Sequence, residues 1–190
     1  MADRSERIMV TGACGRKGSE VTMALRERVG AENVVAVGHK GEPSSTLLEG
    51  GPYEAVDVCD FQALDRLVVE RGVDVIYHLS GICAAAEERE PRLTWNANVK
   101  GLLNVLEVAR VRGLSRVFVE SPDSDAGSGV PASRSFDASN EPLTMSGIAA
   151  LVGRALGRHY ARAYGLDVRG LHSSGDDASE AEPIGLHCGS

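Results

Sequence analysis

The chain has 190 residues, of which 43% are hydrophobic and 25% charged, a composition typical of one ordinary globular domain. Its formal net charge of −7 disfavours a nucleic-acid or membrane-surface partner, because either would select a basic patch. The four cysteines are scattered without CxxC spacing, so we expect free thiols and no metal site. We see neither a secretory leader nor an apolar run approaching ~18 residues, which favours a cytoplasmic protein with no membrane span.

Apolar runs alternate with helical patterns along the chain. The first unit is a short buried strand at 7–10, a glycine-rich turn and a helix at 19–29. Further strands are predicted at 33–37, 53–58, 73–79, 114–120 and 166–171, and further helices at 61–71, 91–112 and 144–164. Strands separated by helices in this way predict a parallel sheet with right-handed crossovers.

The turn after the first strand carries the clearest motif. Gly12, Gly15 and Gly18 follow a buried strand and open a helix, which is the context required of a phosphate-binding turn. Such a turn brings backbone N–H groups and the positive end of the helix dipole to a diphosphate. The predicted fold is therefore α/β, a Rossmann-like doubly wound parallel sheet in three α/β/α layers. We expect residues 1–175 to form one dinucleotide-binding domain and 176–190 a flexible tail.

Four segments together resemble a known family. The glycine turn at 11–18, Val56-Asp57-Val58, the segment at 77–81 (YHLSG) and the segment at 95–101 (WNANVKG) are similar to the extended short-chain dehydrogenase/reductases, the NAD-dependent epimerase/dehydratase family. The most similar branch is the bacterial-type L-threonine 3-dehydrogenases. The resemblance covers residues 7 to about 175.

The resemblance implies roles for residues at matching positions. The turn would hold the diphosphate, Asp57 and Val58 would contact adenine, and Asn98 would anchor the active-site strand end. The helices at 91–112 and 144–164 would form a homodimer. With the cations discussed below, the expected cofactor-binding residues are Gly12, Cys14, Gly15, Arg16, Lys17, Gly18, His39, Lys40, Asp57, Val58, Leu79, Ser80, Gly81 and Asn98.

The chain departs from the family where the chemistry occurs. The family's catalytic Tyr-x-x-x-Lys pair falls on Ser146 and Ala150, and its catalytic Ser/Thr falls on Pro122. A serine hydroxyl without an adjacent cation cannot replace the tyrosine base, and losing acid–base catalysis typically lowers a rate by ~10²–10⁴. The resemblance also implies a C-terminal substrate lobe, for which we expect no counterpart in these 190 residues.

Substitute catalytic groups are only weakly indicated. The candidates are Ser121, Asp123, Ser124 and Ser146. Glu120, Asp123 and Asp125 follow the fifth strand, and a carboxylate there can serve as a base for non-redox chemistry, but a solvated acidic loop is the favoured interpretation of these residues. His172 is a further acid or base candidate, and a nucleophilic Cys83 would need an activating partner that the sequence does not reveal.

The residues after the second strand bear on the choice of dinucleotide. The acidic residue that grips the adenosine ribose in the family appears as Gly38, followed by His39 and Lys40, while Arg16 and Lys17 stand in the glycine turn. Positive charge without the carboxylate suits a 2′-phosphate, so NADP is favoured over NAD. Exposed cations without a ligand are the simpler alternative.

Three functions remain open on these residues. The first is an NAD(P)-binding enzyme of the epimerase/dehydratase type with an atypical, non-redox active site. The second is a catalytically inactive dinucleotide-binding protein that acts as a regulatory or interaction module. The third is an ordinary NAD-dependent dehydrogenase or epimerase acting on a small hydroxy or amino-acid substrate.

Overall fold

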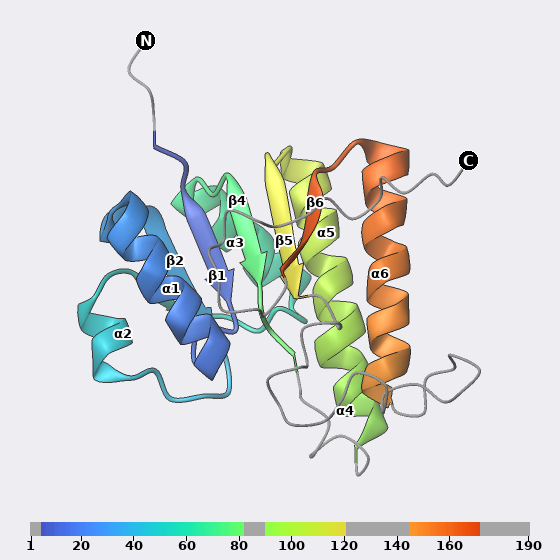
Figure 1. The fold of residues 1–190 in the computed structure, drawn as a ribbon, viewed down its shortest axis with the longest axis horizontal. Helices are drawn as coiled ribbons and strands as arrows, with labels where there is room; N and C mark the ends of the chain where they lie inside the picture. Colours follow the sequence, from blue (N-terminus) through green and yellow to red (C-terminus); the bar gives the residue numbers. More distant parts are fainter. Residues whose placement is uncertain (1–4, 82–89, 121–144, 172–190) are drawn as a thin grey trace.

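A parallel six-stranded sheet forms the centre of the protein (Figure 1). The computed structural model describes residues 5–81, 90–120 and 145–171. The strand order is β3-β2-β1-β4-β5-β6, so the order reverses between β1 and β4. The strands are β1 (Ile8–Thr11), β2 (Val34–Gly38), β3 (Tyr53–Ala55), β4 (Val75–His78), β5 (Arg116–Glu120) and β6 (Val168–Leu171). All five pairings are parallel, which confirms the doubly wound α/β sheet.

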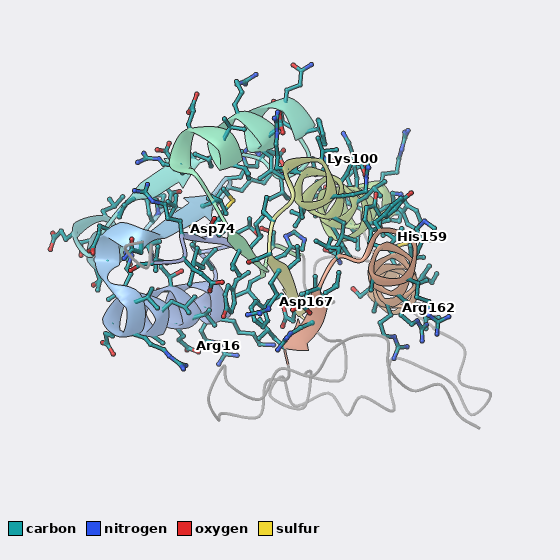
Figure 2. The ribbon with its side chains drawn as sticks, turned by 90° about the horizontal axis from the view of Figure 1, so that it is seen from above. Arg16, Asp74, Lys100, His159, Arg162 and Asp167 are labelled. Carbon is teal, nitrogen blue, oxygen red and sulfur yellow. The ribbon has the colours of Figure 1, made fainter. Side chains whose placement is uncertain are left out.

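Helices cover both faces of this sheet and complete the three layers (Figure 2). One face packs on α1 (Arg16–Val29), through a core that includes Val10 and Tyr77. The opposite face carries α3 (Phe61–Arg71), α5 (Gly101–Arg112) and α6 (Met145–Tyr164). The central strands β1, β2 and β4 are buried along their whole length, as strands covered by helices on both sides must be.

Several element boundaries differ from the sequence expectation. The helix predicted from residue 19 begins at Arg16, because Gly15 itself is the N-cap of α1. The strands predicted at 53–58 and 73–79 are shorter, ending at Ala55 and His78. The helix predicted at 91–112 forms as α4 (Pro91–Trp95), a π-helical turn η3 (Asn96–Lys100) and α5.

A short helix and a 3₁₀ turn were not predicted. The turn η1 (Ala31–Asn33) leads into β2, and α2 (Ser45–Glu49) follows it. The Ser44 hydroxyl accepts a hydrogen bond from the Leu47 amide (3.2 Å) and so caps α2, while the Leu47 side chain is buried. A five-residue helix with one apolar anchor has too little periodicity to be recognised in a sequence.

Arg26 joins these elements from inside the protein. Its side chain lies on α1 and is 5% exposed. Its guanidinium donates to the carbonyl oxygens of Leu47 (2.7 Å) and Pro52 (2.7 Å). A buried cation requires such partners, and here they tie α1 to α2 and to the start of β3. These contacts hold α2 and the start of β3 in place against α1.

Candidate functional site

The glycine turn between β1 and α1 is too tight for side chains. Gly12 has a φ of +76°, and a Cβ placed on it would lie 2.5 Å from the Leu79 carbonyl oxygen at the end of β4. A Cβ on Gly18 would overlap the Gly12 carbonyl and lie 2.9 Å from the Ala13 Cα. The turn is closed by a hydrogen bond of 3.0 Å from the Gly15 amide to the Gly12 carbonyl. Glycine is therefore required for local packing, as the motif predicts.

The N-terminus of α1 leaves backbone donors available for an anion. The first N–H groups of an α-helix have no acceptor within the helix, and the first turn of α1 contains Arg16 and Lys17. No side chain of the described residues caps this end, and the first turn contains no acidic residue. A diphosphate would therefore meet free amides, the helix dipole and two cationic side chains, so these residues fit the phosphate part of a dinucleotide.

At the end of β2, side chains fill the space beside Gly38, the position to which the sequence resemblance assigns a ribose-gripping carboxylate. Gly38 occupies that position, and a Cβ there would collide with the Cys14 sulfur and lie 2.6 Å from the Tyr53 hydroxyl. The Cys14 sulfur and the Tyr53 hydroxyl are themselves 3.4 Å apart. Burial, together with the Cys14 contact, raises the pKa of Tyr53 to about 12, so the phenol keeps its proton and can donate it in a hydrogen bond.

Ionisable groups of both signs follow β2 and β3. The His39 Nε2 lies 3.3 Å from an Asp57 carboxylate oxygen, and the other Asp57 oxygen accepts the Cys59 amide (2.9 Å). Burial raises the pKa of the Cys59 thiol, whereas the positive charges of Lys40 and Lys100 act to lower it. Lys100 was not among the predicted residues. It lies on η3, on the opposite side of the sheet from Arg16 (Figure 2).

The remaining predicted cofactor residues line the ends of β3 and β4. Leu79 follows β4, and its amide donates to the Thr11 carbonyl (3.1 Å). A Cβ on Gly81 would lie 3.3 Å from the Asn98 Oδ1, so the Leu79-Ser80-Gly81 segment meets the π-helical turn. Val58 is 7% exposed, and its carbonyl accepts the Asn104 side-chain amide (2.9 Å). Val58 is thus held inside the fold.

The catalytic candidates are placed only in part. Ser121, Asp123, Ser124, Asp125, Cys83 and His172 lie outside the described residues. Ser146 stands in the first turn of α6, and its buried hydroxyl has no hydrogen-bond partner in the described part of the chain. Ala150, one turn later, supplies no charge. The described residues therefore hold no tyrosine–lysine couple at the family's position.

An ion pair between Lys17 and Glu120 was missed by the sequence analysis. The Lys17 ammonium contacts the Glu120 carboxylate, although 103 positions separate the two residues. Both had been identified singly, one in the glycine turn and one after the fifth strand. Only the strand order, which sets β5 two strands from β1, brings them together.

Other kinds of site are absent from the described residues. In residues 5–81, 90–120 and 145–171, no three His, Cys, Asp or Glu side chains are grouped so as to hold a metal ion. None of the helices described has the length and apolar character needed to cross a membrane.

Comparisons with known proteins agree with this architecture. The model of the NAD dependent epimerase/dehydratase family matches residues 8–174. An uncharacterized epimerase/dehydratase of Staphylococcus aureus (strain USA300) is 31% identical over 181 residues, which are 95% of this chain and 56% of that protein.

Two solved structures are similar over the same region. The L-threonine dehydrogenase from Clostridium difficile superposes with a TM-score of 0.77 at 31% identity, over 89% of this chain and 53% of that one. The holo form of a GalE-like L-threonine dehydrogenase from Cupriavidus necator gives a TM-score of 0.75 at 32% identity, over 87% and 53%. The chain thus spans about half the length of these relatives. It belongs to the NAD-dependent epimerase/dehydratase family.

Proposed function

We propose that the chain binds a nicotinamide dinucleotide at the glycine turn, with NADP preferred over NAD, and serves a non-redox reaction. The observation that carries the proposal is the turn itself: Gly12 and Gly18 admit no side chain, and the first turn of α1 contains no acidic residue and has no side-chain cap. The dinucleotide would supply binding energy and, in a conventional family member, the hydride acceptor.

The preference for NADP rests on the adenosine end. Gly38 itself brings no carboxylate that would repel a 2′-phosphate, and Cys14 and Tyr53 occupy the space in which a carboxylate side chain would fit. The Asp57 carboxylate lies nearby but is paired with His39, at 3.3 Å. His39 and Lys40 follow directly in the chain. A phosphate here would gain charge-assisted hydrogen bonds, whereas the ribose of NAD would lose the acceptor that usually holds its hydroxyls.

The non-redox assignment rests on Ser146 and Glu120. The Ser146 hydroxyl is a far weaker acid than a phenol and has no cation beside it in the described residues. Glu120 is the last residue of β5 and carries a carboxylate. In the family, the catalytic Ser/Thr follows this strand. A carboxylate at that position can take a proton from a carbon acid, which suits elimination or isomerisation.

Titration with the two dinucleotides tests the binding part. NADP⁺ at one hundred times its dissociation constant should stabilise the protein by about 2.7 kcal/mol, which a thermal melt detects. Lys40→Ala should lower the ratio of NADP to NAD affinity, while Arg66→Ala, an exposed cation on α3, serves as the matched control. The same ratio of NADP to NAD affinity in wild type and Lys40→Ala would contradict the proposed preference for NADP.

Turnover measurements distinguish a non-redox enzyme from an inactive dinucleotide sensor and from an ordinary dehydrogenase. A non-redox enzyme consumes substrate with no net change in nicotinamide absorbance. An inactive sensor binds the dinucleotide but converts no substrate, and an ordinary dehydrogenase reduces NAD as it oxidises a small hydroxy or amino acid. Substrates should be tested as chemical classes, beginning with 3-hydroxy amino acids and nucleotide sugars, the compounds named for the similar enzymes.

We further propose that the chain forms a homodimer through α5 and α6. These helices lie side by side on one end of the sheet (Figure 1). Large apolar side chains remain exposed on this helix layer, among them Leu103 (39%) and Ile148 (38%). Sedimentation of wild type and a Leu103→Glu/Ile148→Glu variant tests this, because two charges on a buried interface should shift the protein to monomer.

A further inference from the structure

The Lys17–Glu120 ion pair spans the place where the sheet reverses its strand order. Lys17 lies just after β1, Glu120 ends β5, and β4 lies between these strands. In open α/β sheets, ligands bind outside the carboxyl ends of the strands at this reversal. The pair therefore joins elements on either side of β4, the strand that Leu79 and Ser80 follow.

Lys17 is also within reach of the diphosphate position. It stands in the first turn of α1, directly before Gly18, among the amides that are free for an anion. Its side chain is 35% exposed and that of Glu120 is 37% exposed, so neither is locked inside the core. A lysine is a flexible point charge that can change partners by rotating its side chain.

A dinucleotide would compete with Glu120 for this ammonium. The diphosphate carries more charge than one carboxylate and would additionally be held by the α1 amides. A half-exposed ion pair is weak, so breaking it should reduce binding by no more than ~5-fold. The exchange is therefore favourable once the dinucleotide is in place.

We propose that Lys17 exchanges Glu120 for the diphosphate when the dinucleotide binds, and that this exchange frees the Glu120 carboxylate to act as the base. The inference rests on the proposed function. In the free protein Glu120 is neutralised by Lys17. In the complex it stands uncompensated at the end of β5, where a substrate proton can be taken. Binding of the dinucleotide and activation of the base are thereby coupled through one side chain.

A double-mutant cycle on binding tests the exchange without any substrate. The dissociation constants of NADP⁺ and NAD⁺ are measured by calorimetry for wild type, Lys17→Met, Glu120→Gln and the double variant. Glu70→Gln, an exposed glutamate near the end of α3, is the control for the loss of one negative charge. Circular dichroism confirms that each variant is folded.

The exchange predicts a specific pattern. Glu120→Gln should tighten dinucleotide binding ~3–5-fold, since Lys17 no longer has to leave a partner, and Lys17→Met should weaken it. In the Lys17→Met background, Glu120→Gln should have little effect. Tightening of equal size in both backgrounds reflects only long-range charge and overturns the exchange, as does unchanged binding in Glu120→Gln. If wild type binds neither dinucleotide, the proposed function fails too, whereas binding without coupling refutes the exchange alone.

Discussion

His78 makes the stability of the fold depend on pH between about 6.5 and 4. It ends β4, is 5% exposed, and its Nδ1 lies 2.8 Å from the Thr11 hydroxyl on β1. Desolvation by burial lowers the pKa of His78 from 6.5 to about 4. The folded protein therefore keeps the ring neutral at pH values where the unfolded chain already protonates it. Its contribution to stability is present above pH 6.5 and is lost as the pH falls towards 4.

The size of the effect follows from the two pKa values. One pKa unit corresponds to 1.36 kcal/mol, so the shift is worth about 3 kcal/mol in full and about 2 kcal/mol between pH 7.5 and 5.0. Carboxylates paired with arginine do not add to this change in unfolding free energy between pH 7.5 and 5.0. Hydrogen bonds from Arg112 hold the pKa of Asp65 below its ordinary value, and those from Arg110, with one from Tyr160, do so for Glu107. Their stabilisation is lost only at lower pH.

Urea unfolding followed by circular dichroism at several pH values measures this prediction. Wild type should lose about 2 kcal/mol of unfolding free energy from pH 7.5 to 5.0. His78→Gln should be less stable at pH 7.5 but show a much flatter profile. His159→Gln, an exposed histidine on α6, should retain the wild-type slope. An equal slope in wild type and His78→Gln would refute the reasoning, and an NMR titration of the His78 ring that gave a pKa near 6.5 would do the same.

Three further substitutions test the packing around the site. Gly18→Ala should lower the unfolding free energy by about 1–3 kcal/mol, because the added methyl meets backbone, and should abolish the thermal shift with NADP⁺. Arg26→Met should cost roughly 3 kcal/mol, since the Leu47 and Pro52 carbonyls lose a charged donor; hydrogen exchange should then rise first in α2. Asp60→Ala removes the cap of α3 and should cost about 1 kcal/mol in a urea melt, whereas Asp60→Asn should cost much less.

Sequence patterns predicted the fold well because they are local. A buried strand, a glycine turn and an amphipathic helix each lie within one stretch of the chain, and the parallel sheet follows from their alternation. The partners of long polar side chains are decided by strand order instead. The Lys17–Glu120 pair, the Arg26 contacts and the approach of Lys100 to Cys59 each join distant segments. No spacing rule connects such residues before the topology is known.

The packing around Gly38 limits what a single substitution at the end of β2 can do. Replacing Gly38 by aspartate would return the family's carboxylate, yet its Cβ would collide with the Cys14 sulfur and come within 2.6 Å of the Tyr53 hydroxyl. Those two side chains already contact each other and fill the position. A Gly38→Asp variant therefore has to displace the Cys14 sulfur and the Tyr53 hydroxyl, and Cys14→Ala in the same chain should ease that displacement.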